Sequence, residues 1–292
     1  MFWHHSHLAQ ALDRWAALSW RGVQPRRRLD LADWQADWRD NLQLLRRFAT
    51  SAHYGQPQTF AGHAALENSM RWEAAAQAAS NQLLKALDRG LAGAALRLMY
   101  RDVVAVWRDL AEVLRHAQDS LHAAGVDQQV GVPIRADTQQ YEFALQLLAL
   151  GVLLDAQDEI PGIVEHLLHF RTDRLLDYLS AQALGLEEAS EQTFHPRPFG
   201  QLAAFFEQLG EPSPEPLAAY LDEQYRCFFL LSPRQQKSTR RLIGPQAWGY
   251  WALEVSALTV LYGWDDALLR SSPHYLADLV DFARGEMSHG EG

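Results

Sequence analysis

The chain has 292 residues, 48% of them apolar and 11% aromatic, which is enough for one large or two ordinary domains and excludes a globally disordered chain. Its formal net charge is −10, and its single cysteine, Cys227, excludes an intramolecular disulfide or a cysteine-based metal site. No apolar run approaches the roughly 20 residues of a membrane span, and residues 1–20 lack the apolar core of a signal peptide, so we expect a cytoplasmic protein.

Helical periodicity dominates the N-terminal part of the chain. Helices are expected at residues 8–19, 64–87 and 93–121. Between the first two, Asp30 and Asp33 open a helix whose apolar residues recur at helical spacing: Trp34, Trp38, Leu42, Leu45 and Phe48. The helix at 93–121 carries the stripe Leu98, Val103, Val106, Leu110, Val113 and Leu114. Because alternating Val/Ile/Thr runs are nearly absent, the expected class is all-α, a multi-helix, bundle-like protein.

An arginine run, Arg26, Arg27 and Arg28, precedes the second helix. Neither aromatic nor further basic residues are interleaved with it, as they would be in a nucleic-acid-binding patch. We therefore interpret it as a solvated turn.

A domain boundary is expected near residues 123–138, where Gly125, Gly131 and Pro133 interrupt the helical periodicity. The charge balance also changes there, because residues 137–292 hold 10 Lys and Arg against 23 Asp and Glu. We divide the chain into an N-terminal helical domain, residues 1–135, and an acidic C-terminal helical domain, residues 136–292. So acidic a domain repels nucleic acid and anionic membranes and attracts a basic partner.

Two strongly apolar helices are expected in the C-terminal domain, and each ends in acidic residues. The first, at 141–154, is followed by Asp155, Asp158 and Glu159. The second, near 248–262, is followed by Asp265 and Asp266, and it is so apolar that other elements must enclose it. Carboxylates are unfavourable at a helix C-terminus. In one interpretation, Asp158 and either Asp265 or Asp266 only cap the helices that follow. In the other, these acids cap those helices and also contact a partner.

Glu254 is the single charge inside the second apolar helix. A buried carboxylate must find a cation or hydrogen-bond donors, or become protonated. We expect a structural ion pair, for which Arg226, Arg240 and Arg241 are the candidates in the same domain.

Further helices are expected at residues 163–184, 201–209 and 216–231, and a closing helix is expected to begin at Ser272-Pro273 and run to Phe282. Within the first of these, Asp173 and Asp177 lie four residues apart on one face. We expect both carboxylates to be solvated.

The C-terminal part of the sequence resembles a known run of residues. Its motifs are Gly249-Tyr250-Trp251 with Glu254, then Gly263-Trp264-Asp265-Asp266, then residues 272–280, and residues 141–159 are similar to the opening helix of the same family. Over residues 139–282 the chain is thus similar to PoNi proteins, which confer immunity to secreted PoNe-type DNase toxins of bacteria.

The resemblance implies an immunity protein, not an enzyme, that needs no cofactor or metal and neutralises a basic effector domain, a nuclease. Neither nucleic acid nor a membrane is an expected partner. A nuclease cleft is positive because it holds phosphates, so exposed carboxylates suit it. The expected partner-binding residues are Asp155, Asp158, Glu159, Asp265 and Asp266, and Glu254 is the expected structural buried charge.

Two alternatives stay open. The motif Asp155-x-x-Asp158-Glu159 could hold Mg²⁺ in an all-α enzyme of the isoprenoid-synthase type, although no second metal motif, P-loop or nucleophile motif accompanies it. The chain could also be a helical scaffold without a dedicated ligand, although it lacks a repeat of fixed period. Tight Mg²⁺ binding would separate the enzyme from the other two.

Overall fold

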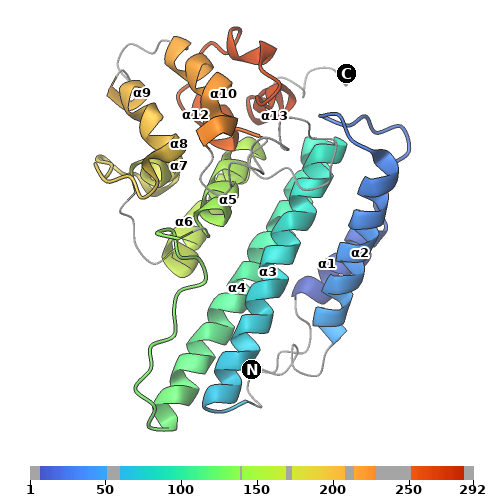
Figure 1. Cartoon of the computed structure of the whole chain (residues 1–292), viewed down its shortest axis with the longest axis vertical. Coiled ribbons are helices and arrows are strands. Elements are labelled where there is room, and N and C mark those ends of the chain that lie inside the picture. Colours follow the sequence, from blue (N-terminus) through green and yellow to red (C-terminus); the bar gives the residue numbers. More distant parts are fainter. Residues whose placement is uncertain are drawn as a thin grey trace. The chain divides into compact units, whose positions relative to one another are not determined.

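The protein is all-α. The computed structural model describes residues 7–50, 60–138, 140–168, 173–207, 214–227 and 251–285, and within these ranges every regular element is helical (Figure 1). The chain divides into two compact units. The first comprises Met1–Arg135 with Glu165–His169, and the second comprises Ala136–Val164 with Phe170–Gly292. The short return of the chain to the first unit was not evident from the sequence.

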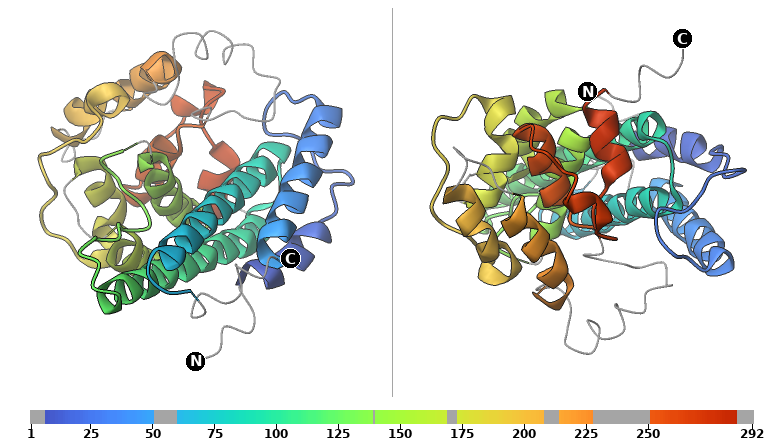
Figure 2. Two further views of the ribbon diagram at one scale, coloured as in Figure 1. Left: turned by 60° about the horizontal axis from the view of Figure 1, so that its bottom comes forward. Right: turned by 90° about the horizontal axis from the view of Figure 1, so that it is seen from above.

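The described part of the first unit is built on two long neighbouring helices, α3 (His63–Arg89) and α4 (Gly93–Ala123), which Figures 1 and 2 show side by side. The helix α2 (Leu31–Thr50) packs on α3, and α1 (His7–Ala16) packs on α4 and α2. Most of the predicted α4 stripe is buried, but Leu98 is 66% exposed, so its assignment to the stripe was wrong. It lies in the first two turns of α4, on the side that no described element covers.

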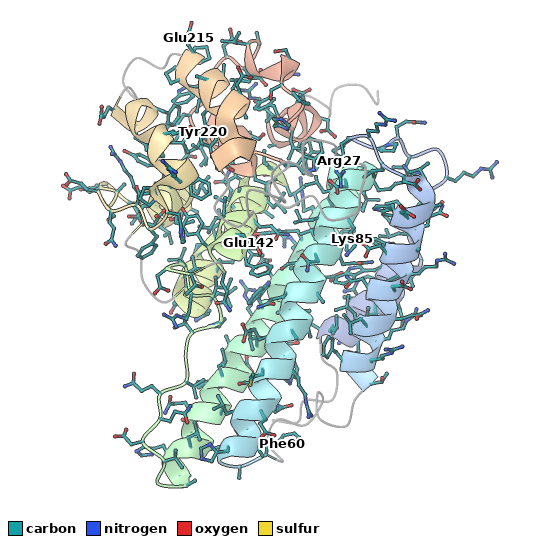
Figure 3. All side chains as sticks on the ribbon, in the orientation of Figure 1. Arg27, Phe60, Lys85, Glu142, Glu215 and Tyr220 are labelled. Carbon is teal, nitrogen blue, oxygen red and sulfur yellow. The ribbon has the colours of Figure 1, made fainter. Side chains whose placement is uncertain are left out.

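The arginine run is not a solvated turn, because two of its side chains bind the end of α3. Arg26 donates from its guanidinium to the carbonyls of Leu87 and Leu91, at 2.8 and 2.9 Å. Arg27, which is labelled in Figure 3, is buried and forms an ion pair with Asp88 at 2.6 Å. Helix C-termini carry partial negative charge and carbonyls without helical partners, so cations are favoured there. The attraction of these cations to the end of α3 explains why the run of like charges is not a solvated turn.

Gly90 makes the close approach of this segment possible. It ends α3 in the left-handed region at φ 93°, and its N–H bonds back to the carbonyls of Ala86 and Leu87. A Cβ at this position would lie 1.8 Å from the carbonyl oxygen of Gln24. Only glycine therefore fits both the backbone angle and the contact.

We expect Gly90→Ala to lower the free energy of unfolding by about 2 kcal/mol more than Gly125→Ala. Gly125 is also left-handed, at φ 69°, but a Cβ there meets nothing within 4 Å, so it isolates the cost of the backbone angle. Urea unfolding of the two variants measures the difference. Equal losses would mean that the contact with Gln24 imposes no constraint.

In the second unit, α5 (Tyr141–Leu153) packs against α12 (Leu253–Leu261), and both are almost wholly buried. This confirms the expected buried helix near 248–262, which begins at Leu253; residues 248–250 lie outside the described residues. Around this pair the chain forms α6 (Ile160–Ile163), α7 (Arg174–Leu184), α8 (Pro196–Phe199), α9 (Ala203–Glu207), α10 (Glu215–Cys227) and α13 (Ala277–Ala283). Single turns occur at Gln157–Glu159, Gly200–Leu202 and Leu269–Ser271. A π-helical turn, Val164–Leu168, follows α6 and lies almost entirely in the short segment that belongs to the first unit.

Asp173 and Asp177 are buried, and the expectation that they are solvated was wrong. Asp173 caps α7 by accepting from the N–H groups of Leu175 and Leu176, and it also accepts from the Tyr141 hydroxyl at 2.7 Å. Asp177 accepts from the N–H of Ser190 at 2.7 Å. Because Asp173 has an extended backbone at the start of α7, the helix expected over residues 163–184 is not continuous.

The closing helix begins at Ala277, four residues later than expected at Pro273. The intervening residues bind the start of α12 instead. The carbonyl of His274 accepts from the N–H of Ala252 at 3.0 Å, and the N–H of Leu276 donates to the Ser256 hydroxyl at 3.1 Å. These contacts hold residues 272–276 in a non-helical turn where the Ser-Pro pair favoured a helix start.

Candidate partner-binding surface

The turn after α12 places two neighbouring acids, Asp265 and Asp266, in different surroundings. Gly263 takes the left-handed conformation at φ 64°. Asp265 is exposed and accepts from the N–H of Ala267 at 3.0 Å, a contact within the turn itself. In the described range 251–285 no α-helix begins near Ala267, and the single turn Leu269–Ser271 has Leu268 as its N-cap without a side-chain cap, so the expectation that one of these two acids caps the next helix was wrong. Asp266 is buried, at 5% exposure. Only the first of the two carboxylates is placed to meet another molecule.

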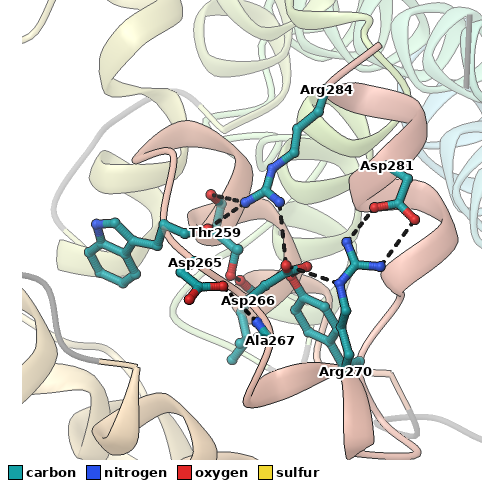
Figure 4. A network of polar contacts seen from close by, with 10 residues as sticks. Thr259, Asp265, Asp266, Ala267, Arg270, Asp281 and Arg284 are labelled. Carbon is teal, nitrogen blue, oxygen red and sulfur yellow. Dashed lines mark hydrogen bonds and ion pairs between the residues drawn. The ribbon is translucent and has the colours of Figure 1, made fainter. Parts of the chain in front are cut away.

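Asp266 is the centre of a polar network that holds the turn together (Figure 4). Its Oδ1 accepts from Arg270 Nε at 3.0 Å and from Arg284 at 3.4 Å, and its Oδ2 accepts from the Tyr275 hydroxyl at 2.9 Å. Burial alone would raise the pKa of Asp266, but the hydrogen bonds from Arg270 and Tyr275 and the two positive charges hold this pKa below its ordinary value. The carboxylate is therefore ionised and structural.

The two arginines extend this network to the flanking elements. Arg284, just after α13, donates to the carbonyl of Trp264 at 2.5 Å and reaches that of Thr259 at 3.5 Å, near the end of α12. Arg270 forms a bidentate pair with Asp281 of α13. A fixed turn presents Asp265 in one conformation, which reduces the entropy that binding would cost.

The turn after α5 carries the other three acids. Asp155 is exposed and has a left-handed backbone at φ 49°, Asp158 is exposed, and Glu159 is half-buried. The N-cap residues here are Ala156 for the single turn and Glu159 for α6, and neither makes a side-chain cap. The expectation that Asp158 caps the next helix was therefore wrong. The described contacts of Asp265 and Asp266 stay within residues 259–284, so they do not connect the two acidic turns.

Glu254 is buried as expected, at 1% exposure, but its described partner is a hydroxyl group. Tyr220 of α10 donates to Glu254 Oε1 at 2.5 Å. The side chains of Arg226, Arg240 and Arg241, the expected ion-pair partners, lie outside the described part of the chain. Burial raises the pKa of Glu254 to about 7, against the smaller opposing effect of the hydrogen bond from Tyr220. This glutamate holds α10 (Tyr220 in Figure 3) against α12.

An aromatic cluster that the sequence analysis did not single out adjoins the turn of Asp265. Tyr178 stacks on Phe206 with ring centroids 4.2 Å apart, and it lies 6.3 Å from Tyr262. Trp264, beside Asp265 in the chain, packs edge-on to Phe205 at 4.0 Å. Tyr178 and Tyr262 are only half-buried. Tyrosines are frequent anchors of protein interfaces. In the sequence, the run Tyr262-Gly263-Trp264-Asp265 was the feature that could have indicated this cluster.

The described residues bear on the alternatives left open by the sequence. No group of three or more His, Cys, Asp or Glu side chains there is placed to hold a metal ion, so the Asp155-x-x-Asp158-Glu159 motif gains no support as a Mg²⁺ site. Among the described helices, none combines the length and the apolar character that crossing a membrane requires.

Comparison with known proteins decides the family. The crystal structure of protein PA2201 from Pseudomonas aeruginosa is 58% identical in sequence and superposes with a TM-score of 0.85, covering 96% of this chain and 98% of that one. This chain belongs to the PA2201 family. Residues 3–125 match the PA2201 N-terminal domain-like family, and residues 171–279 match the C-terminal domain of PoNe immunity proteins (PoNi). No curated protein matches the chain.

These matches confirm the resemblance to PoNi proteins over a segment of the chain. The matched segment runs from before α7 to within α13 and includes the turn of Asp265. It begins after α5, so the expected similarity of residues 141–159 to the family's opening helix lies outside it. The chain thus carries a domain characteristic of immunity proteins.

Proposed function

We propose that this PA2201-family protein is an immunity protein that binds and neutralises a cognate antibacterial toxin in the cytoplasm, without catalysing a reaction. The single observation that carries the proposal is the match of residues 171–279 to the PoNi C-terminal domain. The toxin that fits is a secreted DNase effector. Its DNA-binding cleft must be positive, and the C-terminal domain, with 23 acidic against 10 basic residues over 137–292, complements such a cleft.

The contact surface that we propose is centred on Asp265, with Tyr262 and Tyr178 as aromatic anchors beside it. The carboxylate would occupy a phosphate position of the toxin's cleft, and the tyrosine rings would supply contact area at low entropic cost. Asp155, Asp158 and Glu159 form a second proposed contact on the same domain. Asp266 was expected to be a contact as well, but its burial supports a different role, that of fixing the turn.

Charge reversal at the exposed acid tests the proposal. We expect Asp265→Lys to abolish protection of cells that coexpress the toxin encoded beside this gene, because it places a cation against a basic cleft. Charges at the edge of an interface affect mainly the association rate. The association rate of the purified proteins should therefore fall about tenfold or more, and it should depend less on salt concentration. Growth and surface plasmon resonance at two salt concentrations measure these effects.

Asp40→Lys is the matched control, since it makes the same change of charge at an exposed position of α2 in the other unit. It should protect as well as the wild type. If both variants protect fully, Asp265 is not a contact. If the wild-type protein fails to protect against, or to bind, the neighbouring toxin, the immunity function itself is refuted.

A further inference from the structure

The first unit contains a groove that the immunity function does not use. It has a volume of about 510 Å³ and lies between α2 and the segment that follows α1. Three indole rings line it: those of Trp20, Trp34 and Trp38. Trp34 and Trp38 are almost fully buried, whereas Trp20 is half-buried and presents the accessible ring. The volume is in the range of small-molecule sites, which is about 300–1,000 Å³.

The rings are held in place by contacts within the unit. Trp34 and Trp38 stack with centroids 5.3 Å apart, and Trp20 packs edge-on to both, at 4.9 and 4.8 Å. Arg89, at the end of α3, donates to the carbonyl of Trp20 at 3.3 Å and lies 5.9 Å above the ring of Trp34. The aromatic wall is therefore formed before any ligand arrives, which lowers the cost of binding.

The rim of the groove is cationic. Arg39 and Arg46, both exposed on α2, line it together with the carboxamides of Gln35 and Gln43, and no acidic residue does. Other arginines of the unit are paired, such as Arg14 with Asp102 and Arg27 with Asp88. Arg39 and Arg46 make no ion pair with the described residues; Arg39 Nε donates only to the carbonyl of Gln35, at 3.2 Å.

We propose that this groove is a binding site for a small aromatic anion, a planar ring that carries a carboxylate, sulfonate or phosphate group. The ring would pack against Trp20, and the anionic group would bind the guanidinium groups of Arg39 and Arg46. Guanidinium groups bind planar anions through charge-assisted hydrogen bonds and also stack on aromatic rings. In a chain of net charge −10, a rim with two such arginines and no acid selects against cations.

A matched pair of fluorescent probes tests the two parts of the site. The anion 8-anilinonaphthalene-1-sulfonate and the neutral N-phenyl-1-naphthylamine share their rings and differ in the sulfonate. We expect the anion to bind the full-length protein at one saturable site and more tightly than the neutral probe. Arg39→Gln with Arg46→Gln should weaken the anion at least about tenfold and the neutral probe less than about twofold. Trp20→Leu should weaken both probes.

Arg47→Gln is the control, because Arg47 is exposed on α2 beside Arg46 but does not line the groove. It should leave both affinities unchanged, and circular dichroism of each variant should match the wild type. The proposal is overturned if the anion shows no saturable site, if Arg47→Gln weakens its binding as much as the double arginine variant does, or if the double arginine variant weakens both probes equally.

Discussion

Asp266→Ala is expected to lower the free energy of unfolding of the second unit by about 3 kcal/mol. The substitution removes a buried carboxylate that accepts hydrogen bonds from Arg270, Arg284 and Tyr275. It leaves Arg284, which is only 20% exposed at its side chain, without its anion. Hydrogen bonds to charged groups contribute about 1.5–3 kcal/mol each, and partial exposure of Arg270 reduces the sum. Thermal and urea unfolding of the full chain measure the loss.

The adjacent acid provides the matched control. Asp265→Ala removes an exposed carboxylate that accepts only from the N–H of Ala267, so it should cost about 1 kcal/mol or less. A difference of about 2 kcal/mol between the two variants therefore measures the network around Asp266. Similar small losses in both would mean that the network does not stabilise the turn, and that Asp266 is free to serve as a contact.

Glu254 should make the stability of the second unit fall as the pH rises above 5. Its pKa of about 7 in the folded protein lies above the ordinary value of 4.5, so the folded state binds the proton more tightly than the unfolded chain. The resulting stabilisation is complete below pH 4.5 and is lost as the pH rises through 7. One pKa unit corresponds to 1.36 kcal/mol, so the loss between pH 4.5 and pH 8 is about 3 kcal/mol.

Glu254→Gln should remove this dependence, because the amide can still accept from Tyr220 and never ionises. At pH 8 the variant should be more stable than the wild type by an amount approaching that loss, and at pH 5 the two should be similar. Unfolding by urea at pH 5, 6, 7 and 8 gives both profiles. Parallel profiles of the two proteins would show that Glu254 keeps an ordinary pKa and is therefore not enclosed.

Glu142 titrates in the same direction and needs its own variant. Desolvation raises its pKa to about 8, but its side chain is only half-buried, so solvent screening makes its effect on stability smaller. Glu142→Gln measured beside Glu254→Gln separates the two contributions.

The fold class and several elements could be predicted from the sequence. Apolar spacing placed α2 through Trp34 and Trp38, and the nearly uncharged run that ends at Tyr262 correctly implied an enclosed helix with a single buried carboxylate. Helix starts that depend on distant contacts could not be predicted. Ser272 and Pro273 favour a helix start locally, but hydrogen bonds to the residues around α12 delay it to Ala277.

The sequence by itself determined the all-α class, the burial of α5 and α12 and the similarity to PoNi proteins, because these depend on the spacing and type of neighbouring residues. Only the tertiary structure decided which acids are exposed. Asp265 and Asp266 are adjacent and chemically identical, yet Arg284 and Tyr275 enclose one of them and leave the other in solvent. The groove of Trp20 likewise depends on Arg89, 69 positions away in the chain. Whether a charged side chain is exposed depends on the partners that folding brings to it, and local sequence does not contain them.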